Sequence, residues 1–191
     1  IQGLPVNPNS RKHKQIGTAL KETEADVFGI AELNLNFPVL GPSFQWSERF
    51  RTLYRNHSVH TCNKHDSSKK RTLFGGTAQI SSGACSHRAT KSGTDKTGLG
   101  RWVWTLYAGK HQTTLRVISG YRPNPDSSDS PGLVYSQQER RLCSINDGRN
   151  PRRAFIQDLQ QQLEKWMDAG NLILIRMDAN GNVRTGDVNK M

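Results

Sequence analysis

Cysteine and long apolar runs are both scarce in this chain. Its 191 residues include three cysteines, Cys62, Cys85 and Cys143, and no two of them form a CxxC pair. An odd set with this spacing argues against a disulfide framework or a standard zinc knuckle and favours reduced thiols. No stretch approaches the roughly 18 consecutive apolar residues of a membrane helix, and the N-terminus lacks the charged-then-apolar order of a secretory signal. We therefore expect an intracellular protein without a membrane span.

Acidic residues are also few relative to basic ones. The chain has 16 Asp and Glu against 27 Lys and Arg, which gives a formal charge of +11 at pH 7. Such an excess favours a polyanionic partner, because each cation that neutralises a phosphate releases condensed counterions. Nucleic acid, DNA in the first place, is the expected partner, and an anionic membrane surface is the alternative. We expect a nuclear location and a monomer.

The spacing of apolar residues predicts alternating helices and strands, which is typical of an α/β domain. Strands over 101–108 and 112–120, separated by a short turn, should form an antiparallel hairpin. We expect a single domain over residues 1–191. The other expected elements are a helix over 10–23 capped by Asn9 or Ser10, a strand over 27–31, a helix over 43–56, a strand over 75–81, a helix over 153–168 and a strand over 172–175, with polar loops over 64–71, 86–100 and 124–131.

Two expected buried strands each lead into a carboxylate. Glu32 follows VFGIA, and Asp178 follows LILIRM. Ligands bind at the carboxyl ends of strands in α/β sheets, and carboxylates at that edge can hold a Mg²⁺ ion that bridges to substrate phosphates. In a strongly basic chain this pair indicates metal-assisted phosphate chemistry. The alternative is that both acids are surface charges or helix caps.

Other chemistry-bearing residues have a plainer interpretation. His57, His60, Cys62 and His65 could suggest zinc, but in a strand His60 and Cys62 would lie on the opposite face from His57 and His65. Trp102 and Trp104 share one face of a strand, where packing in the core is favoured over stacking on bases. Basic residues cluster at Lys64, Lys69, Lys70 and Arg71, at His87, Arg88 and Lys91, and at Arg149, Arg152 and Arg153, either as solvated surface or as contacts to a nucleic-acid backbone.

Four segments together carry a resemblance. Residues 25–32 (ADVFGIAE), 75–80 (GGTAQI), 117–123 (VISGYRP) and 172–180 (LILIRMDAN) resemble, in the same order, the strand-end motifs of the endonuclease/exonuclease/phosphatase superfamily. Met177 and Ala179 replace the glycine and the phenylalanine of the last motif. The sequences of residues 98–102 (GLGRW) and 177–180 (MDAN) are most similar to endonuclease domains of retroelement type.

The resemblance implies a fold and its extent. The superfamily has a four-layer α/β/β/α sandwich, with two facing mixed sheets and outer helices. Residues 1–4 fit the tail of its opening NxxGL motif, and its closing Ser-Asp-His motif does not occur after Asn180. Because the chain also starts at Ile1 instead of Met, we expect the first two thirds of a domain, incomplete at both ends, whose activity in isolation is doubtful.

The resemblance also implies roles for individual residues. Glu32 matches the metal ligand, and Asp178 matches the carboxylate that orients or deprotonates the attacking water. Asn180 matches the amide that binds the scissile phosphate or steadies that aspartate, and Tyr121 matches a phenol that contacts the phosphate. Additional candidates for substrate binding are Asn34, which could equally be a turn residue, and Arg122, Lys69, Lys70 and Arg71.

These observations predict a phosphodiesterase that depends on Mg²⁺, or Mn²⁺, and cuts DNA as an endonuclease of retroelement type. Two alternatives stay open at this point. One is a non-catalytic, nucleic-acid-binding remnant of the same fold. The other is a phosphatase of small phosphorylated ligands, although the charge of +11 favours a long polyanion.

Overall fold

The described strands form two sheets. A computed structural model of the chain describes residues 3–7, 9–41, 44–51, 54–63, 69–125 and 133–181. One sheet has the order β1-β3-β2 and the other the order β4-β5-β6-β7. The strands are β1 (Val27–Ala31), β2 (His57–Cys62), β3 (Thr77–Ser82), β4 (Ala89–Thr94), β5 (Trp102–Ala108), β6 (Thr114–Tyr121) and β7 (Leu172–Asp178).

The two sheets differ in strand direction. Every described pair in the β1-β3-β2 sheet is antiparallel, and so are β4-β5 and β5-β6, whereas β6 and β7 are parallel. A parallel pair needs a long crossover, which the helices between β6 and β7 supply. In the described part of the chain, the second sheet is thus mixed, as expected, and the first contains antiparallel pairs.

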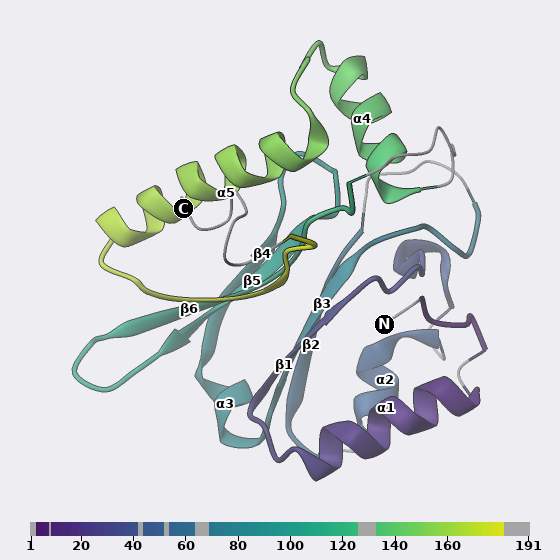
Figure 1. Cartoon of the computed structure of the whole chain (residues 1–191). Coiled ribbons are helices and arrows are strands. Elements are labelled where there is room, and N and C mark those ends of the chain that lie inside the picture. Colours follow the sequence, from purple (N-terminus) through teal and green to yellow (C-terminus); the bar gives the residue numbers. More distant parts are fainter. Residues whose placement is uncertain are drawn as a thin grey trace.

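Helices cover the outer face of each sheet (Figure 1). The first sheet carries α1 (Arg11–Glu22) and α2 (Trp46–Phe50), and the second carries α5 (Pro151–Asp168) with α4 (Val134–Ser144) beside it. Two short helices complete the described elements, η1 (Phe37–Val39) and α3 (Gly83–Arg88). The expected four-layer α/β/β/α sandwich is confirmed.

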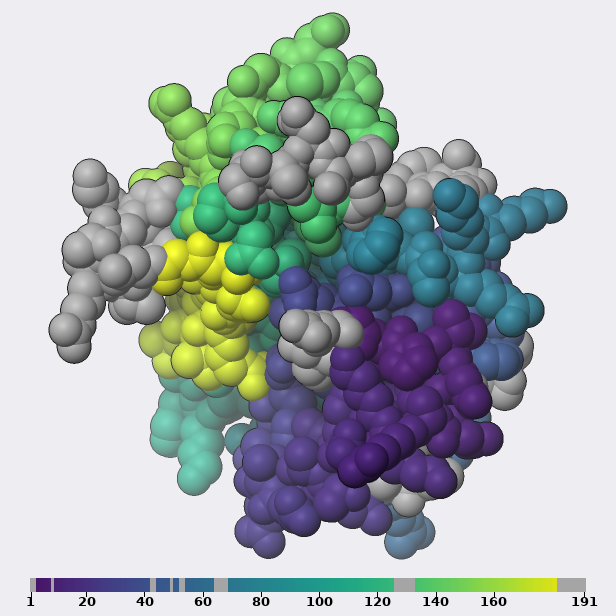
Figure 2. Space-filling view, turned by 45° about the vertical axis from the view of Figure 1, so that its right-hand side comes forward, coloured from purple at the N-terminus to yellow at the C-terminus, as the bar shows by residue number. Residues whose placement is uncertain are grey.

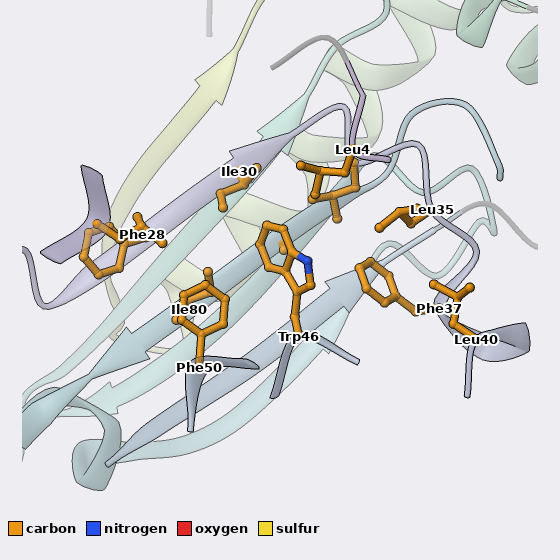
Figure 3. Close-up of a cluster of buried hydrophobic side chains, with 12 residues drawn as sticks. Leu4, Phe28, Ile30, Leu35, Phe37, Leu40, Trp46, Phe50 and Ile80 are labelled. Carbon is orange, nitrogen blue, oxygen red and sulfur yellow. The ribbon is translucent and has the colours of Figure 1, made fainter. Parts of the chain in front are cut away.

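The core under the first sheet is mainly aromatic (Figure 3). Trp46 and Phe50 of α2 pack edge-to-face, with ring centroids 5.5 Å apart, over Phe28, Ile30 and Ile80 of the sheet. Tilted and edge-to-face ring pairs are favoured by the aromatic quadrupole and add to the burial of apolar area. This cluster fixes the position of β1, which leads directly to Glu32.

The core under the second sheet is built on one face of α5, where a helix over 153–168 was expected. Phe155, Leu159, Leu163 and Trp166 of α5 are buried against the sheet. Trp104 packs against Trp166 with ring centroids 5.5 Å apart, and the Arg116 guanidinium lies 4.0 Å from the Trp104 ring. The preference for core packing of Trp102 and Trp104 is confirmed, since both belong to this cluster.

Polar side chains join the two sheets. The Gln79 amide of β3 donates to the Tyr107 hydroxyl of β5 over 3.2 Å, and the Ser119 hydroxyl of β6 donates to Gln79 Oε1 over 3.0 Å. Ser81 also hydrogen-bonds the Tyr107 hydroxyl. Because all four groups are buried and mutually satisfied, they hold the sheets in one register without the cost of unpaired polar atoms.

Most expected elements are present, with shifted ends. Helix α1 is capped by the Ser10 side chain, and α5 begins two residues earlier than expected because Asn150 caps it and Pro151 suits the first turn. Over the expected helix 43–56 the described helix is only α2, and Leu53 and Ser43 lie outside the described residues. Also outside are residues 1–2, 64–68, 126–132 and 182–191, which include Lys64 and His65.

The predicted loop over 86–100 is wrong in its first half. Its first half contains the end of α3 and the strand β4, an edge strand paired with β5. The strand has a polar sequence, ATKSGT, and is mostly exposed, so no alternation of apolar residues marks it. Backbone pairing creates it, together with Gly93, whose missing side chain makes room for the Trp104 ring. Strand β2 was considered from the sequence only as one possibility, and α4 was not expected.

The expectation that the strand ending in Asp178 is buried is also wrong. Among the described strands, β7 lies at the edge of its sheet, and Leu172 and Leu174 are 61% and 47% exposed. Residues 173, 175 and 177 point to α5, where they pack against the core cluster. Apolar character alone could not separate a central strand from an edge strand.

Among the residues that the structure describes, no helix is long and apolar enough to cross a membrane.

Candidate active site

Glu32 stands at the end of β1 in a turn with an unusual backbone. Glu32 and Asn34 have φ values of 56° and 55°, a region that is costly for residues with a side chain. The Leu33 and Asn34 amides donate to the carbonyl oxygens of Gly76 and Gly75, over 3.3 and 2.9 Å, and hold the turn against the glycine pair. Strain of this kind persists only where the surroundings enforce it, and it is concentrated at functional sites.

The strongest contact of the site joins the two sheets. The Tyr121 hydroxyl, at the end of β6, donates to Glu32 Oε1 over 2.5 Å. Tyr121 is 2% exposed, and burial, followed by the hydrogen bond and the negative charge of Glu32, raises the pKa of its phenol well above the usual value. The phenol therefore stays protonated and fixes the orientation of the carboxylate.

Asp178 is brought beside Tyr121 by the parallel pairing of β6 and β7. The register places Tyr121 opposite Asp178, and the Arg122 amide donates to the Asp178 carbonyl over 2.9 Å. The negative charge of Asp178 also contributes to the raised pKa of the Tyr121 phenol, after burial and Glu32. The end of β7 lies next to the N-terminal part of the chain on the surface (Figure 2).

Asn180 follows Asp178 in a tight turn. Its backbone amide donates to Asp178 Oδ1 over 3.2 Å, and its side-chain amide donates to the Arg122 carbonyl over 2.7 Å. The Arg152 guanidinium, from the first turn of α5, donates to the Asn180 carbonyl over 2.9 Å and to the Pro123 carbonyl over 2.5 Å. From the sequence, Arg152 was expected as solvated surface or as a contact to a nucleic-acid backbone, but in the structure its guanidinium ties the two strand ends together.

The structure thus brings Glu32, Tyr121, Asp178 and Asn180 together from three strand ends. The other expected residues have different surroundings. Asn34 Oδ1 accepts from the Gly75 amide over 2.7 Å, so the side chain braces the Glu32 turn while it also lines a hollow beside it. Arg122 is buried, and its guanidinium donates to the Arg152 carbonyl.

The basic residues Lys69, Lys70 and Arg71 are exposed. Asn36 anchors the backbone of this segment. Its side chain donates to the Lys70 carbonyl and its backbone N–H donates to the Arg71 carbonyl, each over 2.9 Å. Their side chains are therefore displayed from an anchored segment that leads to Phe74 and the glycine pair. Such a display suits contact with phosphates.

The donor set can be tested against a divalent metal ion. Glu32 and Asp178 offer carboxylate oxygens at one edge of the sandwich, and Glu32 lines an open hollow. Mg²⁺ is usually bound by one or two carboxylates together with water and substrate phosphates, so these residues fit such an ion. Within the described ranges no group of three or more His, Cys, Asp or Glu could hold a metal by itself.

The residues of the histidine cluster that lie in β2 are on opposite faces of the strand. In β2, His60 and Cys62 face one side and His57 the other, as the period of two requires. His57 contacts the carbonyl oxygens of Tyr54 and Ser47, at 3.1 and 2.8 Å. Hydrogen bonding within the fold thus occupies both ring nitrogens of His57.

Two hollows are lined by residues of this group, one by Asp178 and the other by Glu32 and Tyr121. One, of about 320 Å³, lies between the sheets and is lined in part by Gly29, Arg176 and Asp178. The other, of about 150 Å³, is lined by Glu32 and Tyr121 together with Asn34, Phe74, Asn124, Pro125, Leu133, Val134 and Tyr135. Glu32, Tyr121 and Asn34 were expected from the sequence, whereas the other lining residues were not, and the one signal for them was an aromatic residue, Phe74, between a basic segment and a glycine pair.

Comparison with known proteins yields structural likenesses only. No protein-family model and no curated protein sequence matches the chain. The human Nocturnin catalytic domain, solved with a bound sulfate anion, matches with a TM-score of 0.50 and 11% identity over 93% of this chain and 60% of that one. A β-hairpin deletion mutant of beta toxin from Staphylococcus aureus matches with a TM-score of 0.48 and 15% identity over 96% of this chain and 65% of that one.

The chain therefore spans somewhat less than two thirds of the length of each of these proteins. At 11% identity the likeness to Nocturnin bears on the fold and not on the activity. The element order, the two facing sheets and this likeness agree with the motif order in the sequence. The chain has the two-sheet α/β sandwich of the endonuclease/exonuclease/phosphatase fold.

Proposed function

We propose that the chain carries the active site of a phosphodiester hydrolase that depends on a divalent metal, Mg²⁺ or Mn²⁺, and acts on DNA as an endonuclease. The observation that carries the proposal is the convergence of Glu32, Asp178 and Asn180 around the buried Tyr121 phenol. Two carboxylates, a neutral phenol and an amide at one edge of a sheet are the groups that water attack on a phosphodiester requires.

Each residue has a part that follows from its surroundings. Asp178, exposed at the strand end, accepts the proton of the attacking water as the new P–O bond forms and the bond to the leaving oxygen breaks. Asn180, held in place by Arg122 and Arg152, is positioned to donate to a phosphate oxygen. Glu32, oriented by Tyr121, would hold the metal, and a bound Mg²⁺ would neutralise charge on the phosphate.

DNA is the proposed substrate because of the distribution of charge. The chain carries +11, and Lys69, Lys70 and Arg71 are displayed on an anchored segment near the site. Contacts of this kind position a long phosphate backbone without reading its sequence. That the endonuclease is of retroelement type is proposed only from the sequence similarity of residues 98–102 and 177–180.

Nicking of supercoiled plasmid DNA in the presence of Mg²⁺ tests the proposal. Both Glu32→Gln and Asp178→Asn should reduce the rate by at least about 10²-fold, whereas Asp168→Asn, which removes an exposed carboxylate at the end of α5, should cut like the parent. Equal cutting by all four proteins would refute the site assignment. Since the chain spans less than two thirds of its structural neighbours, the variants should also be compared in the longest polypeptide that contains it.

The same assay separates the alternatives. DNA binding with a steep dependence on salt, but without cutting in any protein, would indicate a non-catalytic binding domain. Release of inorganic phosphate from small phosphorylated compounds, without nicking, would indicate a phosphatase.

A further inference from the structure

We propose that the hollow beside Glu32 binds one unpaired nucleobase of the substrate, so that cleavage occurs next to a base that is outside a duplex stack. The proposal rests on the proposed function and specifies its substrate. Glu32 and Tyr121 form the polar end of the hollow, while Phe74, Leu133 and Tyr135 form its walls. A nucleotide whose phosphate lies at Glu32 would therefore have its base or sugar within reach of these walls.

The exposed apolar side chains of the hollow are the first argument. Phe74 is 56% exposed and Leu133 is 44% exposed, although they come from segments 59 positions apart in the sequence. Phe74 lies three residues after the exposed Arg71 and is not part of the core cluster under the first sheet, so its ring is not held there by core packing. Proteins that bind single-stranded nucleic acid usually combine aromatic side chains, on which the bases stack, with cationic side chains, which contact the phosphate backbone.

The second argument is that the walls are fixed in advance. The Gly75 amide donates to Asn34 Oδ1, and the Asn34 amide donates to the Gly75 carbonyl, which locks the Phe74 segment to the Glu32 turn. A side chain at Gly75 would approach the Val134 methyl groups to 3.3 Å, so the two walls meet there closely. On the other wall, the Tyr135 hydroxyl and the Asn150 side-chain amide are 2.5 Å apart and hydrogen-bonded. A site formed before binding loses less entropy when it takes a ligand.

The third argument is the size and polarity of the hollow. Its volume is about 150 Å³, and a cavity of roughly that size accommodates a benzene-sized ring. A polyol phosphate would place hydroxyl groups against Phe74 and Leu133 and leave them without hydrogen-bond partners, which is costly. A nucleobase presents an apolar face to the rings and polar edges to the amides of Asn34 and Asn124. The hollow thus favours a nucleotide over a small phosphorylated sugar or cyclitol.

A base inside a duplex cannot enter such a hollow, because reaching it requires unstacking and rotation out of the helix. The preferred substrate is therefore a bulge, a mismatch or a single strand. The experiment uses two DNA duplexes that differ by one unpaired 2-aminopurine, and an Asp178→Asn background that prevents cutting. We expect 2-aminopurine fluorescence to be quenched on binding, and the bulged duplex to bind more tightly than the paired one.

Variants of Phe74 identify the stacking surface. Phe74→Ala should weaken binding of the bulged duplex by about tenfold and leave binding of the paired duplex unchanged, while Phe74→Trp should keep the preference. Met167→Ala, which shortens a 55% exposed side chain on the outer surface of α5, is the matched control and should have no effect. An equal loss for both duplexes, or competition by ribose 5-phosphate as strong as that by deoxyadenosine monophosphate, would overturn the proposal.

The two proposals can fail separately. If the bulge is preferred and quenched through Phe74, but Glu32→Gln nicks plasmid as fast as the parent, the base pocket stands and the hydrolase assignment fails. If nicking depends on Glu32 but the preference for the bulge is absent, the hydrolase assignment stands and the base pocket fails.

Discussion

The Tyr121 hydroxyl donates a hydrogen bond of 2.5 Å to Glu32 Oε1, across the gap between the two sheets. Tyr121 is thus a positioning residue for the carboxylate, and its own pKa is raised so far that it does not titrate in the working range of an enzyme. Any loss of activity on its removal reports the orientation of Glu32 and not a proton transfer.

Tyr121→Phe is expected to lower kcat for nicking by about 10²-fold, because one hydrogen bond that orders the charged site is lost, and to change KM little. Tyr107→Phe is the control, since it also removes a buried hydroxyl, bonded to Ser81 and Gln79, but away from the carboxylates. Each variant should lose only about 1 kcal/mol of folding free energy. Steady-state kinetics measures kcat, and urea denaturation measures the folding free energy. A parent-like kcat for both variants would contradict the prediction.

Arg101 is fully buried, and removal of its main carboxylate partner should destabilise the fold. Its guanidinium donates to Asp95 over 2.7 and 3.2 Å and to Asp158 over 2.9 Å. Asp95→Ala leaves that charge without its main partner and should cost about 3 to 5 kcal/mol in urea denaturation. The double variant Asp95→Leu, Arg101→Met should be more stable than Asp95→Ala; a double variant that is less stable would contradict this account of the pair.

The free energy of unfolding should fall as the pH is lowered, because the partly buried His60 imidazole becomes protonated. Burial lowers the pKa of its imidazole in the folded protein, so the unfolded chain binds the proton more readily. The contribution of neutral His60 is complete above the unfolded pKa of about 6.5 and is lost as the pH falls through the lower folded value. Thermal melts between pH 7.5 and 5 should show a smaller loss of Tm for His60→Gln than for the parent. The exposed His87→Gln should behave like the parent, and an unchanged slope for His60→Gln would refute the prediction.

The three thiols should react at different rates with iodoacetamide at pH 8. Burial raises the pKa of Cys62 to about 12 and also raises the pKa of Cys85, whereas Cys143 is exposed on α4. The thiolate is the reactive form, so Cys143 should be alkylated first, Cys85 more slowly, and Cys62 only after denaturation. Mass spectrometry of tryptic peptides measures the order, and alkylation of Cys62 as fast as Cys143 would contradict the assigned burial.

Much of the framework was readable from local patterns. The stripe Phe155, Leu159, Leu163 and the strand 172–175 predicted α5 and most of β7, because periodicity of three to four or a continuous apolar run reports which face is buried. The hairpin of β5 and β6 was likewise marked by a turn between two apolar strands. Strand β4 left no such mark, because an exposed edge strand is made by backbone pairing with its neighbour.

The candidate site divides in the same way. The sequence by itself determined which carboxylates end strands, since Glu32 and Asp178 directly follow apolar runs, and the excess of basic charge that favours a polyanion. Only the tertiary structure decided that Tyr121, 89 positions from Glu32, would donate to it, and that Phe74 and Leu133 would form one hollow beside both. Spacing along the chain reports which residues share a local face, whereas contacts between sheets depend on how the strands pair and how the sheets stack.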